Sequence, residues 1–109
     1  MAYSESLAQR IRDALTHKRK IAEKKMFGGI GFMLHRNTFV IALDASLIVR
    51  LGPEQTPAAL KQLHVSEFVV KGRASKTWVL VAPEGVEDDG QLNDWIRRAE
   101  EFVVTLPAK

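Results

Sequence analysis

The 109-residue chain contains no cysteine, which excludes disulfide bonds, thiolate catalysis and cysteine-ligated metal sites. The segment Met1–Arg10 lacks the apolar core of a signal peptide. No apolar run elsewhere approaches the roughly 20 residues that a transmembrane helix needs. We therefore expect a cytoplasmic protein without membrane contact, and its length predicts a single domain over residues 1–109.

Motifs for catalysis, metal binding and nucleotide binding are also missing. His17, His35 and His64 stand far apart, whereas metal-binding pairs are usually about two to four residues apart. The segment Gly72–Thr77 ends in Lys-Thr, but it lacks the second glycine of a phosphate-binding loop and precedes a β-rich run. The carboxylates of residues 87–89 precede a predicted helix, whose dipole they complement. We predict a non-enzyme with no catalytic, cofactor-binding or metal-binding residues.

Charge is small in total but unevenly distributed. The net charge is +3, yet residues 17–25 carry five cations against Glu23, a local +4. Residues 84–94 carry five carboxylates and no cation, a local −5. Such polarity steers a charged partner toward one side of a molecule. A solvated face is the commoner meaning of a charge run, and both interpretations stay open.

Glycine is concentrated near the N-terminal third of the chain, at Gly28, Gly29 and Gly31. A phosphate-binding loop would open into a helix, but here β-rich runs follow at residues 28–34 and 38–43. We therefore predict that the three glycines shape a hairpin, and that at least one has positive φ or faces a closely packed neighbour. The rival interpretation is that their backbone N–H groups bind an anionic ligand.

Apolar periodicity predicts three helices, over residues 5–16, over residues 56–63 and from Asp88 or Asp89 to Pro107. Strands are expected at residues 21–27, 28–34, 38–43, 47–51, 68–70 and 78–81, with a polar loop over 71–77. We expect about five strands in the sheet, because the lysines make 21–27 at most an exposed edge strand. Short connections favour antiparallel pairing, with the helices on one face. The prediction is an α+β two-layer sandwich in the order α-β-β-β-α-β-β-α.

Basic residues are the remaining candidates for contacts. They are Lys24, Lys25, Arg36, Lys71, Arg73 and Lys76. Together with an aromatic residue, such cations can hold phosphates and stack a base. Trp78 follows the 71–76 loop, although we favour a core position for its side chain.

The chain resembles the N-terminal domain of the TfoX/Sxy competence-regulator family. The matching residues run through nearly the whole chain: Lys25-Met26-Phe27-Gly28-Gly29-Ile30-Gly31, Leu47-Ile48-Val49-Arg50, Gly72-Arg73, Trp78-Val79-Leu80-Val81, Leu92-Asn93-Asp94-Trp95 and Leu106-Pro107-Ala108-Lys109. The resemblance implies an α+β fold and a role in regulating DNA uptake. Full-length members act as transcriptional coactivators beside a cyclic-AMP-responsive activator and carry a second, helical domain, so we expect a stand-alone version of the N-terminal domain.

Two functions follow as hypotheses. The first is a non-enzymatic regulatory or adaptor module that contacts a protein, with the transcription machinery as one candidate partner. The second is direct nucleic-acid binding through a basic face formed by residues 17–25 and 71–76, which requires these segments to share one face. The sequence does not determine the oligomeric state, and a weak homodimer stays open.

Overall fold

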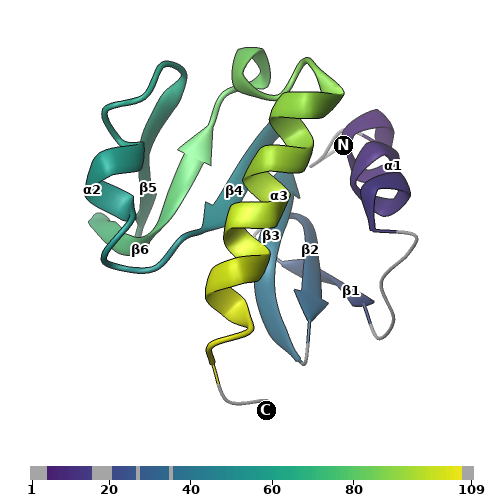
Figure 1. Cartoon of the computed structure of the whole chain (residues 1–109), viewed down its shortest axis with the longest axis horizontal. Coiled ribbons are helices and arrows are strands. Elements are labelled where there is room, and N and C mark those ends of the chain that lie inside the picture. Colours follow the sequence, from purple (N-terminus) through teal and green to yellow (C-terminus); the bar gives the residue numbers. More distant parts are fainter. Residues whose placement is uncertain (1–4, 16–20, 27, 35, 107–109) are drawn as a thin grey trace.

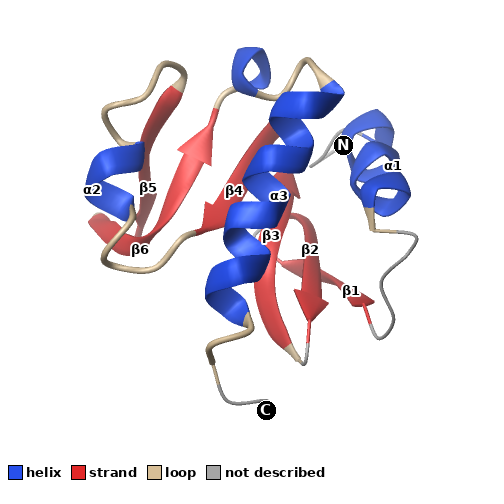
Figure 2. Ribbon diagram, in the orientation of Figure 1, coloured by secondary structure: helices blue, strands red, loops and turns tan. Residues whose placement is uncertain are grey.

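The computed structural model describes residues 5–15, 21–26, 28–34 and 36–106. Within these ranges the helices are α1 (Glu5–Ala14), α2 (Thr56–Ala59) and α3 (Asp89–Val103), with a 3-10 turn at Pro83–Gly85. The strands are β1 (Ile21–Met26), β2 (Gly29–Leu34), β3 (Asn37–Leu43), β4 (Ser46–Arg50), β5 (Val65–Val70) and β6 (Arg73–Val81). All pairings are antiparallel, and the strand order is β1-β2-β3-β4-β6-β5. The three helices lie on one face of this sheet (Figures 1 and 2).

The predicted α+β two-layer architecture is confirmed, with two differences in its strands. The sheet has six strands rather than about five, because the lysine-rich residues 21–26 do pair along β2. The loop predicted over residues 71–77 is wrong, because β6 already begins at Arg73. The middle helix is also shorter than predicted, although it begins at Thr56-Pro57 as expected.

The core lies between the sheet and the helices, because strand side chains alternate between the two faces. On β4, Leu47 and Val49 face the helices and are fully buried. Helix α3 packs against β3 and β4, α1 packs against α3, and α2 packs against β6. At the start of α3, the Gln91 side chain accepts a hydrogen bond from the backbone N–H of Asp88 at 3.1 Å, so Asp88 ends the preceding loop as the predicted cap.

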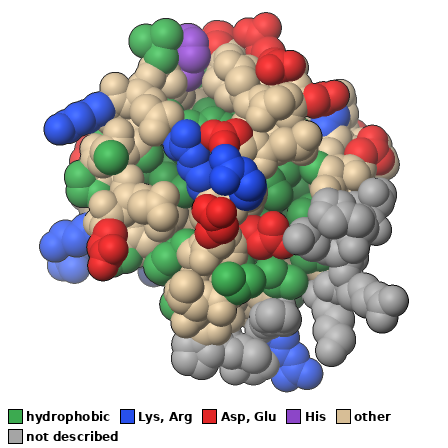
Figure 3. Space-filling model, in the orientation of Figure 1, with side chains coloured by type: hydrophobic (Ala, Val, Ile, Leu, Met, Phe, Trp, Pro, Cys, Tyr) green, Lys and Arg blue, Asp and Glu red, His purple; other side chains and the backbone are tan. Residues whose placement is uncertain are grey.

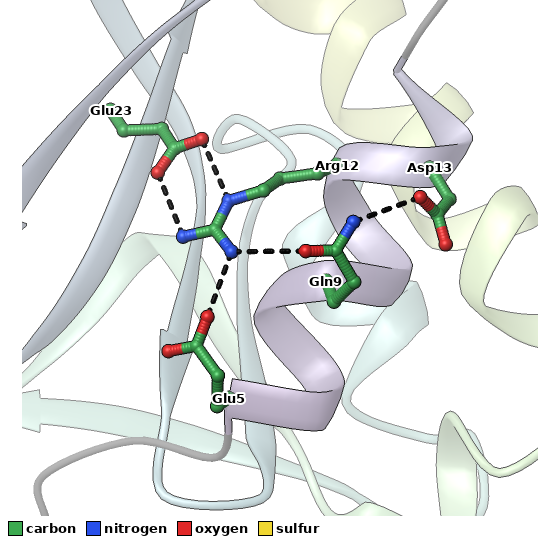
Figure 4. A network of polar contacts seen from close by, with 5 residues as sticks. All are labelled: Glu5, Gln9, Arg12, Asp13 and Glu23. Atoms are coloured by element: carbon green, nitrogen blue, oxygen red, sulfur yellow. Dashed lines mark hydrogen bonds and ion pairs between the residues drawn. The ribbon is translucent and has the colours of Figure 1, made fainter.

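A charged cluster joins α1 to β1 at the edge of the sheet (Figure 4). The Arg12 guanidinium donates to both carboxylate oxygens of Glu23, at 2.9 and 3.0 Å. It also donates to Glu5 at 2.8 Å. These hydrogen bonds, first with Glu23 and then with Glu5, raise the pKa of Arg12 above its ordinary value. The cluster therefore holds an edge strand to a helix through a fully ionised pair.

We expect Arg12→Ala to lower the free energy of unfolding by up to about 1 kcal/mol, as is typical of partly exposed ion pairs. Urea denaturation at low and high NaCl measures this, and salt should shrink the difference because it screens exposed charges. Arg12→Lys is the matched control. It keeps the charge but not the two-pronged contact with Glu23, so it should restore only part of the loss. Equal stability of wild type and Arg12→Ala at low salt would contradict this role.

The glycines shape the first hairpin, as predicted. Gly28 has a φ of +78°, in the left-handed region that favours glycine. Gly29 instead faces a close neighbour, because a Cβ there would lie 2.2 Å from the backbone oxygen of Ala42 on β3. A Cβ on Gly31 would lie 2.8 Å from the Met26 sulfur. Close packing in the sheet therefore accounts for two of these glycines and a turn conformation for the third.

We expect Gly29→Ala to destabilise the domain by about 1–3 kcal/mol, because the added methyl must displace backbone rather than a side chain. Gly31→Ala is the matched comparison and should cost less, since the Met26 thioether can move aside. Thermal and urea unfolding of both variants measure the difference. An unchanged midpoint for Gly29→Ala would favour the rival interpretation, in which this backbone serves a ligand.

Candidate functional site

The helix-free face of the sheet carries a second layer of apolar side chains. Directly paired residues place their side chains on the same face. Ile41 of β3 pairs with Ile48 of β4, which pairs with Leu80 of β6. Two residues further along β4, Arg50 pairs with Trp78. Ile41 and Ile48 are buried although they lie outside the core under the helices.

A pocket of about 480 Å³ opens on this face. Its volume is typical of small-ligand sites, which span about 300–1,000 Å³. Among the described residues, its walls combine apolar side chains, two hydroxyls and three arginines, and they include no carboxylate. The lining residues are Met26, Arg36, Thr38, Ile41, Arg50, Phe68, Val70, Arg73, Ala74, Ser75 and Trp78.

Arg50 is the most constrained of the three arginines. One of its terminal nitrogens donates to the Thr38 carbonyl oxygen at 3.2 Å. Its guanidinium carbon lies 5.5 Å from the ring centre of Trp78 and 5.9 Å from that of Phe102, so two aromatic rings flank the cation. Its Nε atom is buried without a hydrogen-bond acceptor among the described residues. Burial lowers the pKa of Arg50, because it removes water from the charged form.

An irregularity in β6 shapes the wall that carries Trp78. Between the pairs Glu67–Val79 and Val69–Ala74, β6 has four residues where β5 has only Phe68. The Ser75 hydroxyl oxygen accepts hydrogen bonds from the backbone N–H groups of Thr77 and Trp78, at 3.1 and 3.0 Å. The Ser75 side chain thus stabilises a turn of the backbone within β6, and residues on both sides of this turn line the pocket.

The structure brings together some of the basic residues singled out by the sequence. Arg36 and Arg73 both line the pocket. Lys24 is on the same face, because it pairs with Gly31, which in turn pairs with Ile41. Lys25 pairs with Ile30, a core residue, and is therefore on the helix face.

The two segments of the predicted basic face are only partly described. Residues 17–20 lie outside the described residues, and β1, which holds residues 21–25, is at the opposite edge of the sheet from β5. Lys71 lies in the turn between β5 and β6, with a φ of +53°, and Lys76 is exposed on β6.

Sequence reasoning missed three important members of the site. Arg50 and Met26 were not singled out, and the preference for Trp78 in the core is wrong. Trp78 is partly buried on the helix-free face and does not belong to the core cluster. A signal for Arg50 existed, because it is a charge two residues after the apolar Ile48 on the same face of the strand.

The cations on the helix face differ from those in the pocket (Figure 3). Blue and red side chains lie together over α3 in this view. Arg97 contacts both Asp94 and Glu101, and Arg98 lies 2.9 Å from Asp94. Within the described residues, no carboxylate forms an ion pair with any of the three pocket arginines.

The chemistry of the pocket suits binding. The charged side chains among its described lining residues are arginines, whose guanidinium groups act only as hydrogen-bond donors. In the part of the chain that the structure describes, no three His, Asp or Glu residues gather as metal ligands. No helix within the described ranges is long and apolar enough to cross a membrane.

Comparison with known proteins yields one match. The family model of the TfoX N-terminal domain matches residues 13–103, which include all the pocket-lining residues. No curated protein and no solved structure matches the chain.

The free energy of unfolding should change by less than about 1 kcal/mol in Arg50→Met. The variant removes a partly buried charge that lacks a carboxylate and keeps a similar apolar volume, and such exchanges are often neutral or stabilising. Leu51→Ala, one residue further along and 1 % exposed, is the reference and should cost about 2–5 kcal/mol. Urea denaturation measures both variants. A loss in Arg50→Met comparable to that in Leu51→Ala would show that Arg50 serves the fold.

Proposed function

The chain belongs to the TfoX N-terminal domain family, and from this premise we propose that it is a regulatory or adaptor module without catalytic activity. It works in the cytoplasm by contacting another protein, and through that protein it influences transcription linked to DNA uptake. The partner that the family suggests first is a cyclic-AMP-responsive activator.

The observation that carries this proposal is the pocket on the helix-free face. Arginine and tryptophan are the residues most enriched at the centres of protein interfaces, because they combine a large contact area with directed polar contacts. Here Arg36, Arg50 and Arg73 line the same open pocket as Trp78. Since these arginines have no carboxylate partner in the described part of the chain, an acidic surface on another protein would complement them.

Direct nucleic-acid binding is the second candidate. Arg36 and Arg73 could contact phosphates while Trp78 stacks a base, because all three line one pocket. Against it, Lys25 is on the helix face and so does not share the face of the pocket.

We expect the labelled chain to bind a purified cyclic-AMP-responsive activator from the same cell, held on its DNA site, in a fluorescence-anisotropy titration. The double variant Arg36→Glu/Arg73→Glu should bind at least about tenfold more weakly, because it places like charges opposite an acidic surface. Arg97→Glu on the helix face is the matched control and should bind as the wild type does.

The same titration against DNA alone separates the two candidates. Binding to bare DNA that falls steeply with salt would favour the nucleic-acid alternative, because released counterions give that dependence. Absence of binding to the activator complex, or equal weakening by Arg97→Glu, would contradict the proposed protein contact through this face.

A further inference from the structure

We propose that the pocket on the helix-free face binds a small organic anion with a flat apolar body, such as an aromatic carboxylate. This inference goes beyond the regulatory role and does not depend on it, because it rests on the pocket alone. It assigns a ligand class to the site formed by β1, β3, β4, β5 and β6.

The apolar part of such a ligand matches the walls of the pocket. Ile41 forms part of a buried apolar layer, and Met26, Phe68, Val70 and Trp78 extend the apolar lining around the opening. A volume of about 480 Å³ accommodates a one- or two-ring compound. The polarisable Met26 thioether lies over Gly31, where the absence of a side chain leaves it room to adjust to a ring.

The anionic part matches the arginines. A guanidinium presents donors in a planar fork that fits a carboxylate with two parallel hydrogen bonds. Arg50 has a buried Nε without an acceptor, in a position that is partly withdrawn from water. Arg36 and Arg73 line the same pocket, and neither forms an ion pair with a described carboxylate. An anion in the pocket would therefore lie beside the Arg50 guanidinium and offset its desolvation.

The polar lining also argues against sugars and nucleobases as the specific ligand. Reading their hydroxyl groups or base edges needs side chains that both donate and accept, such as Asn, Gln, Asp and Glu. Among the described residues that line the pocket there are none of these, and the neutral polar side chains are Thr38 and Ser75. The Ser75 oxygen already accepts two backbone hydrogen bonds. Charge and apolar surface are thus what the pocket can recognise.

The test uses the two tryptophans of the chain as paired reporters in ¹H–¹⁵N NMR spectra. Trp78 lines the pocket, whereas Trp95 of α3 belongs to the core and is 6 % exposed. Naphthalene-2-carboxylate is the probe, and the uncharged naphthalene-2-carboxamide has nearly the same shape. We expect saturable shifts of the Trp78 indole N–H with the carboxylate, little change at Trp95, and at least about tenfold weaker binding of the amide. Trp95→Phe assigns the two signals.

Variants connect the shifts to the arginines. Arg50→Met and Arg73→Met should each weaken carboxylate binding by about tenfold or more and leave amide binding nearly unchanged, while Arg97→Met should change neither. Naphthyl phosphate tests the other common anion, and tighter binding of it would assign the pocket to phosphate esters of the same class. Equal binding of carboxylate and amide, joint shifts of both indoles, or no saturable shift at millimolar probe would overturn the proposal.

Discussion

Alternation along β4 is the constraint on which the core and the pocket both depend. Leu47 and Val49 face the helices, and the alternation therefore directs Ile48 and the start of the Arg50 side chain to the other face. The Arg50 guanidinium carbon nevertheless lies 5.9 Å from the ring of Phe102, a residue of α3. A slip of one residue would exchange the two sets and bring the Arg50 charge into the core. The cost of burying that charge fixes the register of β4 between β3 and β6. The same register opposes Arg50 to Trp78, so core formation places the central pair of the pocket.

The glycines of β2 connect the hairpin to the pocket in the same way. Gly29 lets β2 approach the Ala42 carbonyl on β3, and Gly31 leaves space that the Met26 side chain occupies. Met26 comes from β1 but reaches the pocket through this space. The glycine-rich stretch thus has a structural role, and through Met26 it also shapes one wall of the pocket. The sequence presents a structural role and a ligand-related role for these glycines as alternatives, but here the first supports the second.

The sequence predicts most elements of this fold because their signals are local. The stripe of α3, the Thr56-Pro57 start of α2 and the strands on either side of Arg36 all depend on near neighbours. The start of β6 was missed because its polar residues 73–77 are held by the Ser75 turn and by the pairing with β5, which periodicity does not report. Trp78 was misplaced for another reason. Both faces of β6 near it are apolar, so composition cannot tell which face the helices cover.

The pocket could not be predicted because it depends on register between distant strands. Its three arginines come from a turn, from β4 and from the start of β6, and only the paired sheet brings them together. The absence of ion pairs between these arginines and the described carboxylates also depends on the tertiary structure. Ion pairs with carboxylates of the same or a neighbouring element hold Arg12, Arg97 and Arg98, and these pairs link parts of the fold. Arg50 instead lies beside two aromatic rings, and its Nε has no hydrogen-bond acceptor among the described residues. Partial burial lowers its pKa. A folded domain that keeps such a charge in an open pocket is arranged to receive an anion from outside, whether from a small molecule or from the acidic surface of a partner.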